Sequence, residues 1–121
     1  MKKNRIRATA SFIVDCLAAR NYCLLEKLDF GQDMPSGYVR IPSGYIKQAV
    51  REYGGEVTVA PDPTAYRIDV IRHADIKHIL FVDVRLWFDG QESDLTLQCA
   101  FHTNQTLDGL YRFSMTDLDV L

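Results

Sequence analysis

The stretch FVDVRLWFDGQESDLTLQC, residues 81–99, constrains the fold most, because apolar and polar residues alternate on both sides of an Asp-Gly pair. Alternation with a period of two residues is typical of a β-hairpin that buries one face. A type II′ turn centred on Gly90-Gln91 makes every cross-strand pair on one face apolar, which a slip of one residue would not allow. These predicted pairs are Leu86 with Leu95, Val84 with Leu97 and Val82 with Cys99.

The other face of this predicted hairpin is polar but carries a tryptophan. The same register places Trp87 opposite Asp94, Arg85 opposite Thr96 and Asp83 opposite Gln98. One interpretation is structural: Arg85 pairs with an acid across the strands, and Trp87 lies over a neighbouring stem or under the N-terminal helix. The other is a contact surface, since Trp and Arg are enriched at interface hot spots. The expected partner-binding residues are Asp83, Arg85, Trp87, Asp89, Glu92 and Asp94.

The chain upstream of the hairpin has helical patterns. Apolar residues recur every three or four positions over 5–28, with a break expected at Asn21. A second helix is expected after Ser43, which would serve as its N-cap, and should end at Gly54-Gly55 because glycine adopts left-handed conformations readily. Expected strands cover residues 56–59, 65–72, 79–88, 93–102 and 110–121.

Helices followed by a run of strands predict an α+β fold, with N-terminal helices packed on one face of a four- or five-stranded antiparallel meander. By element order this shape is cystatin-like or NTF2-like. A length of 121 residues fits one domain over residues 1–121. The residues expected to be buried are Leu86, Leu95, Leu97, Phe101 and Phe113.

Charge is unevenly distributed along the chain. Residues 1–61 contain nine Lys/Arg and six Asp/Glu, whereas residues 62–121 contain five and ten. The acidic second half disfavours nucleic acid as its partner and favours either a basic protein or simple solvation. Three unclustered cysteines, no signal peptide and no apolar segment of membrane-spanning length predict a cytoplasmic protein with reduced thiols.

No residue pattern in the sequence is typical of catalysis. His73, His78 and His102 lack the spacing of a zinc pair and are expected at the surface, and Asp117 and Asp119 are expected to be solvated. The chain has no phosphate-binding glycine motif and no nucleophile elbow. The sequence therefore predicts a protein that is not an enzyme and uses no cofactor or metal.

Several segments together resemble a family of small bacterial α+β proteins with no assigned activity, over residues 40–121. In that family a helix ends in Glu-Tyr-Gly, and a tryptophan precedes an acidic turn and a Ser-Asp-Leu-Thr-Leu strand. The matching residues are Glu52-Tyr53-Gly54, Pro61, Trp87, Ser93-Asp94-Leu95-Thr96-Leu97 and Asp117. Phe88 follows the tryptophan where the family pattern has threonine, so no role of that hydroxyl carries over.

The resemblance extends to the size and character of immunity proteins of polymorphic toxin systems, including contact-dependent growth inhibition. It implies a non-catalytic protein that neutralises a cognate toxin domain, with a nuclease as the expected toxin. A basic protein partner suits the acidic second half of the chain, because nuclease active sites hold phosphates. Two alternatives stay open. One is a small-ligand carrier or enzyme with a cavity between helices and sheet, and the other is a homo-oligomer paired through the exposed sheet face.

Overall fold

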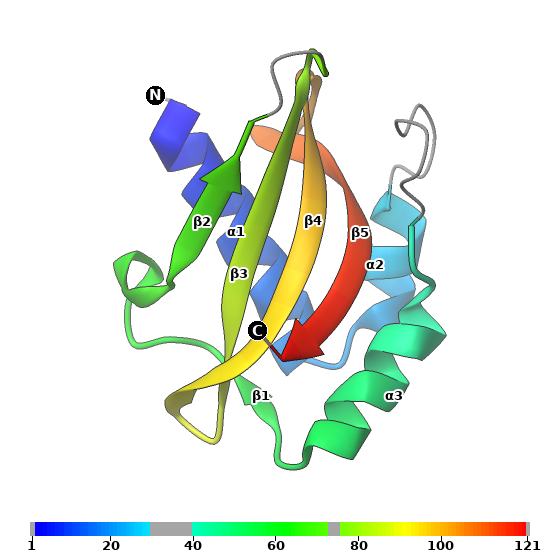
Figure 1. Ribbon diagram of the computed structural model, residues 1–121, viewed down its shortest axis with the longest axis vertical. Helices are drawn as coiled ribbons and strands as arrows, with labels where there is room; N and C mark the ends of the chain where they lie inside the picture. Colours follow the sequence, from blue (N-terminus) through cyan, green and yellow to red (C-terminus); the bar gives the residue numbers. More distant parts are fainter. Residues whose placement is uncertain (1, 30–39, 73–75, 121) are drawn as a thin grey trace.

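The computed structural model describes residues 2–29, 40–72 and 76–120. Within these residues an open five-stranded antiparallel sheet carries the helices on one face (Figure 1). The predicted α+β class is confirmed. The helices are α1 (Lys2–Ala18), α2 (Tyr22–Leu28) and α3 (Ser43–Tyr53), with a 3₁₀ turn at Pro63–Ala65. The strands are β1 (Val57–Thr58), β2 (Ile68–Ile71), β3 (Ile79–Phe88), β4 (Gln91–Leu107) and β5 (Leu110–Val120).

Strands β2 to β5 form the expected meander. Strand β3 pairs with β4 along one edge, and its other edge pairs with β2 and, near the hairpin tip, with the short β1. Strand β5 pairs with β4 and is bridged in parallel by Asp29, which follows α2. The tight β3–β4 and β4–β5 turns therefore place residues 79–120 in one continuous surface, which β2 extends at one edge.

The turn between β3 and β4 differs from the predicted one. Phe88 pairs with Gln91, so Asp89 and Gly90 are the central residues, with φ of 52° and 80°. Positive φ at both central positions is the type I′ arrangement, for which Asp-Gly is a favoured pair. The prediction of a type II′ turn centred on Gly90-Gln91 was wrong because it moved the turn one residue along the chain.

The predicted register is correct in the middle of the hairpin and wrong near its tip. Val82 pairs with Cys99 and Val84 with Leu97 as expected, but Trp87 pairs with Glu92 and not with Asp94. The register shifts between Arg85 and Trp87, where β4 has two extra residues. A serine stabilises this bulge.

The Ser93 hydroxyl donates to the carbonyl oxygen of Leu86 at 2.7 Å and accepts from the amide of Leu95 at 3.2 Å. These bonds satisfy backbone groups that the shifted ladder leaves without a strand partner.

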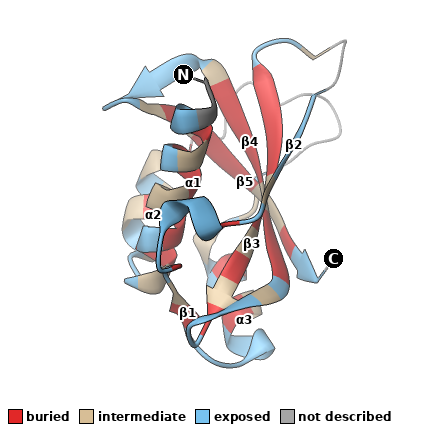
Figure 2. Cartoon of the chain, turned by 90° about the vertical axis from the view of Figure 1, so that its left-hand side faces the viewer, coloured by how far each residue is buried: buried red, intermediate tan, exposed pale blue. Residues whose placement is uncertain are grey.

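The core lies between the helices and one face of the sheet (Figure 2). The helices contribute apolar side chains that are almost fully buried, among them Ile13, Leu17, Leu25 and Ile46. All five residues predicted to be buried are buried. The break at Asn21 is confirmed, because its side chain caps α2. Ser43 is not the N-cap of α3; Pro42 precedes the helix, and the Ser43 amide donates to Glu26 at 2.8 Å.

A buried hydroxyl attaches α1 to β5. Thr9 is fully buried, and its Oγ1 accepts a hydrogen bond from the Tyr111 amide at 3.1 Å while donating to the Arg5 carbonyl at 2.7 Å. We expect Thr9→Val to cost about 1–3 kcal/mol of unfolding free energy, because it leaves the Tyr111 amide without a partner. Thr9→Ser keeps the hydroxyl and should cost less. Urea titrations of both variants measure the difference, and equal losses would show that the hydroxyl does not contribute.

Candidate interaction surface on the outer face of the sheet

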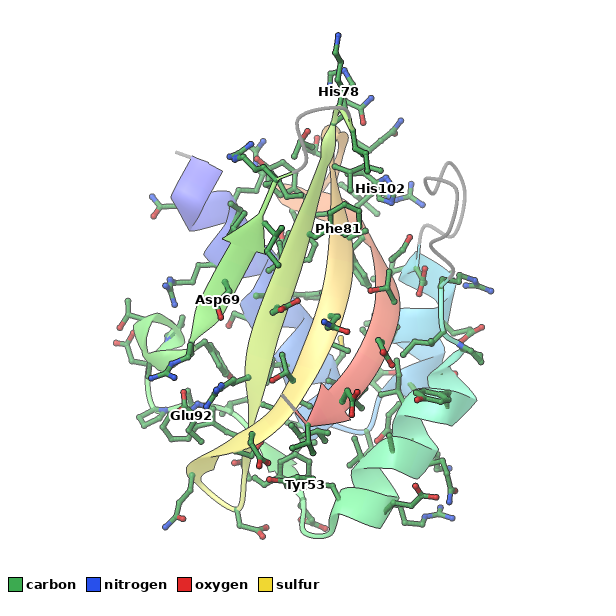
Figure 3. All side chains as sticks on the ribbon, viewed as in Figure 1. Tyr53, Asp69, His78, Phe81, Glu92 and His102 are labelled. Carbon is green, nitrogen blue, oxygen red and sulfur yellow. The ribbon has the colours of Figure 1, made fainter. Side chains whose placement is uncertain are left out.

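An acidic row crosses the face of the sheet that points away from the helices. Asp69 on β2 is directly opposite Asp83 on β3. Asp83 is opposite Gln98 on β4, which is opposite Asp117 on β5. Residues opposite each other on neighbouring strands point to the same face of the sheet. Val82 and Val84, the two neighbours of Asp83 on β3, are buried on the helix side, so Asp83 points to the outer face. Figure 3 views the sheet from the outer side, with Asp69 labelled on β2.

The two carboxylates at the β2 end of this row face each other. Burial raises the pKa of Asp83, the neighbouring Asp69 raises it further, and a hydrogen bond with Gln98 opposes both effects. Among the described residues no lysine or arginine forms an ion pair with either acid. A positive group brought to this position from outside would therefore stabilise Asp83 in its charged form.

The spacing of the acidic row does not favour a metal ion. Neighbouring strands are about 4.8 Å apart, so Asp83 and Asp117, which lie on either side of Gln98, are about 10 Å apart. Within residues 2–29, 40–72 and 76–120, no group of three or more His, Cys, Asp and Glu is placed to hold a metal. The row instead presents separated charges, an arrangement suited to several basic side chains of a larger partner.

Arginines lie beside the acidic row on the β2–β3 side. Arg85 is opposite Thr96 on β4, which is opposite Asp119 on β5. The Arg85 amide donates to the Arg67 carbonyl at 3.2 Å, which places Arg67 beside it at the edge of the sheet. The expected ion pair of Arg85 with Asp83 or Asp94 does not form among the described residues. The outer face is thus acidic across its middle and on β5, and basic at one edge.

Trp87 combines features of both predicted roles, packing in the core and contact with a partner. It is partly buried and packs against the main core, yet part of the side chain stays accessible. Its indole nitrogen is buried and has no hydrogen-bond partner within the described part of the chain. Trp87 therefore contributes to packing, and only its accessible part is available to a partner.

The acids at the hairpin tip bind neighbouring elements. Asp89 accepts a hydrogen bond from the Glu56 amide at 3.1 Å, and a Cβ at Gly55 would lie 2.5 Å from its carboxylate. Asp94 accepts from the Tyr53 hydroxyl at 2.6 Å. Both acids are exposed but attach the tip to the end of α3. Figure 3 labels Tyr53 near that end and Glu92 on the opposite side of the hairpin. Exposed Glu92 makes no such contact with another described residue, so it is the most accessible of the tip acids.

The six residues expected to bind a partner thus form two groups. Three lie on the outer face of β3, and three lie at the tip, where the bulge separates Asp94 from its predicted place opposite Trp87. Asp69 also lies on the outer face, and the sequence interpretation missed that Asp117 completes a row with it. The register of β5 was the missing signal, because β5 pairs with β4 through two irregularities.

A second polar cluster is buried near the middle of β5. The His102 Nε2 lies 3.3 Å from the Ser114 hydroxyl, which in turn hydrogen-bonds the Asp29 carboxylate. His102 and Ser114 are 3% and 0% exposed, so a substrate cannot reach them. The expectation of a surface position was wrong for His102; His78 is exposed, and His73 lies outside the described residues. This cluster is structural in character.

The cysteines are free, with Cys16 and Cys99 buried and Cys23 exposed. Burial raises the pKa of the Cys99 thiol, which disfavours the reactive thiolate. Among the described residues no helix has the length and apolar character needed to cross a membrane.

Comparison with known proteins identifies a family and no activity. No curated protein and no solved structure matches the chain. The model of one family, DUF7668, described as a domain of unknown function, matches residues 14–121. That range includes the end of α1, both other helices and the whole sheet. The chain therefore belongs to the DUF7668 family.

Proposed function

We propose that this protein is a non-catalytic binding protein that receives a basic protein partner on the outer face of its sheet. The observation that carries this proposal is the acidic row, whose three carboxylates have no ion-pair partner among the described residues. Unpaired acids repel one another in the free protein. A basic surface would remove that repulsion, so its charge would be complementary.

The partner we propose is a bacterial toxin domain, with a nuclease as the best fit. A nuclease binds the phosphates of nucleic acid in a basic active site. The carboxylates of the acidic row, which lie on different strands, form a row of negative charges as those phosphates do. The protein would then act as an immunity protein of a toxin system such as contact-dependent growth inhibition, by covering that site. Arg67 and Arg85 at one edge would disfavour partners that are basic throughout, which gives the surface selectivity.

The acidic row is expected to control the rate of association. Asp69→Asn combined with Asp117→Asn should lower the association rate constant about tenfold at low salt and much less at high salt, because electrostatic steering is screened. Asparagine at position 117 keeps the acceptor for the Leu118 amide, which Asp117 binds at 2.8 Å, so folding should be unaffected. The measurement is surface plasmon resonance on an immobilised nuclease toxin domain that binds the wild-type protein.

Asp15→Asn is the control, because Asp15 is an exposed acid on α1 on the other side of the sheet. It should leave association unchanged. It removes one charge where the double variant removes two, so a change half as large in the logarithm of the rate would mean that only net charge matters. An unchanged rate for the double variant would exclude the outer face. Asp89 and Asp94 are unsuitable for this test, because their substitution would also detach the hairpin tip from α3.

A further inference from the structure

A basic pocket lies on a different part of the molecule from the acidic row. It is formed where the end of α1, one side of α3 and the segment leading into β1 meet, and has a volume of about 250 Å³. Leu17, Val50 and Val57, all buried, form its apolar wall. Its polar wall consists of Arg20, Lys47, Arg51 and Glu56. The elements that surround it are those shown at the lower end of Figure 1.

The charges of the pocket are not balanced. Glu56, its single acid, forms an ion pair with Arg20. Lys47 and Arg51 are four residues apart on α3, which places them on the same side of the helix. Among the described residues neither has an ion-pair partner. Like charges at this spacing repel each other and destabilise the helix, and an anion bound between them would remove that repulsion.

Arg20 places a third cation at the rim of the pocket. It follows α1 with φ of 58°, the left-handed conformation that commonly ends a helix. This conformation turns the chain at the rim, where the guanidinium reaches Glu56. The Arg20–Glu56 pair therefore leaves Lys47 and Arg51 as the unbalanced charges of the pocket.

We propose that this pocket binds the phosphate group of a small phosphorylated molecule. Arg51 supplies planar donors that fit phosphate oxygens in pairs, and Lys47 supplies a point charge beside it. The buried apolar wall favours a ligand with a compact carbon body next to its phosphate. A pocket of this volume accommodates a small molecule and not a folded partner. The proposal is independent of partner binding by the acidic row.

The test is a titration of the full chain, labelled with ¹⁵N, with inorganic phosphate, pyrophosphate and phenyl phosphate at constant ionic strength. We expect saturable shifts of the Gly55 and Val57 amides, which line the pocket, and tighter binding of phenyl phosphate than of inorganic phosphate. Lys47→Gln with Arg51→Gln should weaken binding at least about tenfold, since two charge-assisted contacts are lost. Both residues are exposed and glutamine is a good helix former, so the variant should fold.

Lys27→Gln with Arg72→Gln is the matched control, because it removes the same charge from exposed positions outside the pocket. It should leave the affinities unchanged. Equal weakening by the two double variants, or equal shifts with chloride, would overturn the proposal by showing that net charge alone is responsible. Tighter, pocket-dependent binding of a single-stranded oligonucleotide or of vesicles with anionic lipid would also overturn it, in favour of a polymeric or membrane phosphate.

Discussion

Phe101→Ala is expected to lower the free energy of unfolding by about 3–5 kcal/mol, a large part of the stability of a typical small domain. Phe101 is fully buried at the centre of β4, directly opposite Phe113 on β5. Its ring also lies 6.4 Å from that of Tyr111. Removal of the ring leaves a cavity between sheet and helices that long β-strands cannot close by a small shift.

Phe12→Ala is the matched control, because Phe12 on α1 is only partly buried and packs at the margin of the same core. It should cost clearly less than Phe101→Ala. Chemical denaturation monitored by circular dichroism gives both values. A loss at Phe12 as large as that at Phe101 would mean that the helix–sheet margin, and not the centre of the sheet, determines stability.

The buried residues of the strands were predictable because successive residues of a β-strand point to opposite faces of the sheet, whatever the strand pairs with. Leu97 and Phe101 are four positions apart on a part of β4 whose pairing with β3 is regular, so their burial follows from the period of a strand. The Asp-Gly turn was recognised as a hairpin tip, but its centre was misplaced by one residue. The pairing in the middle of the hairpin remained correct because the bulge at Ser93 absorbs the difference.

The acidic row was less predictable, because it depends on two strands that are distant in sequence. Asp69 and Asp117 share a row only through the successive registers of β2, β3, β4 and β5. The β4–β5 pairing contains irregularities near Gln98 and His102 that no local pattern reveals. The basic pocket was missed for a similar reason: Arg20 meets Lys47 and Arg51 only when α1 and α3 pack on the same sheet face.

Asp29 is a buried acid at which the structure predicts a strong effect of pH. Its side chain is 1% exposed, and burial raises its pKa from 3.8 to about 6. The Met115 amide donates to Oδ2 at 3.3 Å, and Ser114 and Arg40 also favour the charged form, but these contacts offset burial only in part. Arg40 stays 3.9 Å from Oδ1, and Glu26 adds a like charge. The buried carboxylate is therefore costly at neutral pH.

The direction of the pH effect follows from proton binding. Between pH 4 and pH 6 the folded chain holds a proton on Asp29 that the unfolded chain has lost, so stability falls as pH rises through this window. The shift corresponds to a loss of about 3 kcal/mol, fully present above pH 6. Asp29→Asn cannot ionise and keeps an acceptor for the Met115 amide. Relative to the wild type, this variant should gain about 3 kcal/mol of unfolding free energy between pH 4 and pH 7.

Asp62→Asn is the control with the opposite sign. Asp62 accepts hydrogen bonds from the Thr64 amide and hydroxyl, which lower its pKa, so its ionisation stabilises the fold as pH rises. Relative to the wild type, Asp62→Asn should therefore lose stability over the same pH range. The measurement is urea denaturation of the three proteins at pH 4, 5, 6 and 7, with the difference from the wild type taken at each pH. If the difference for Asp29→Asn is constant across the series, the Asp29 carboxyl does not titrate near pH 6, and its contacts with Met115, Ser114 and Arg40 fully compensate its burial.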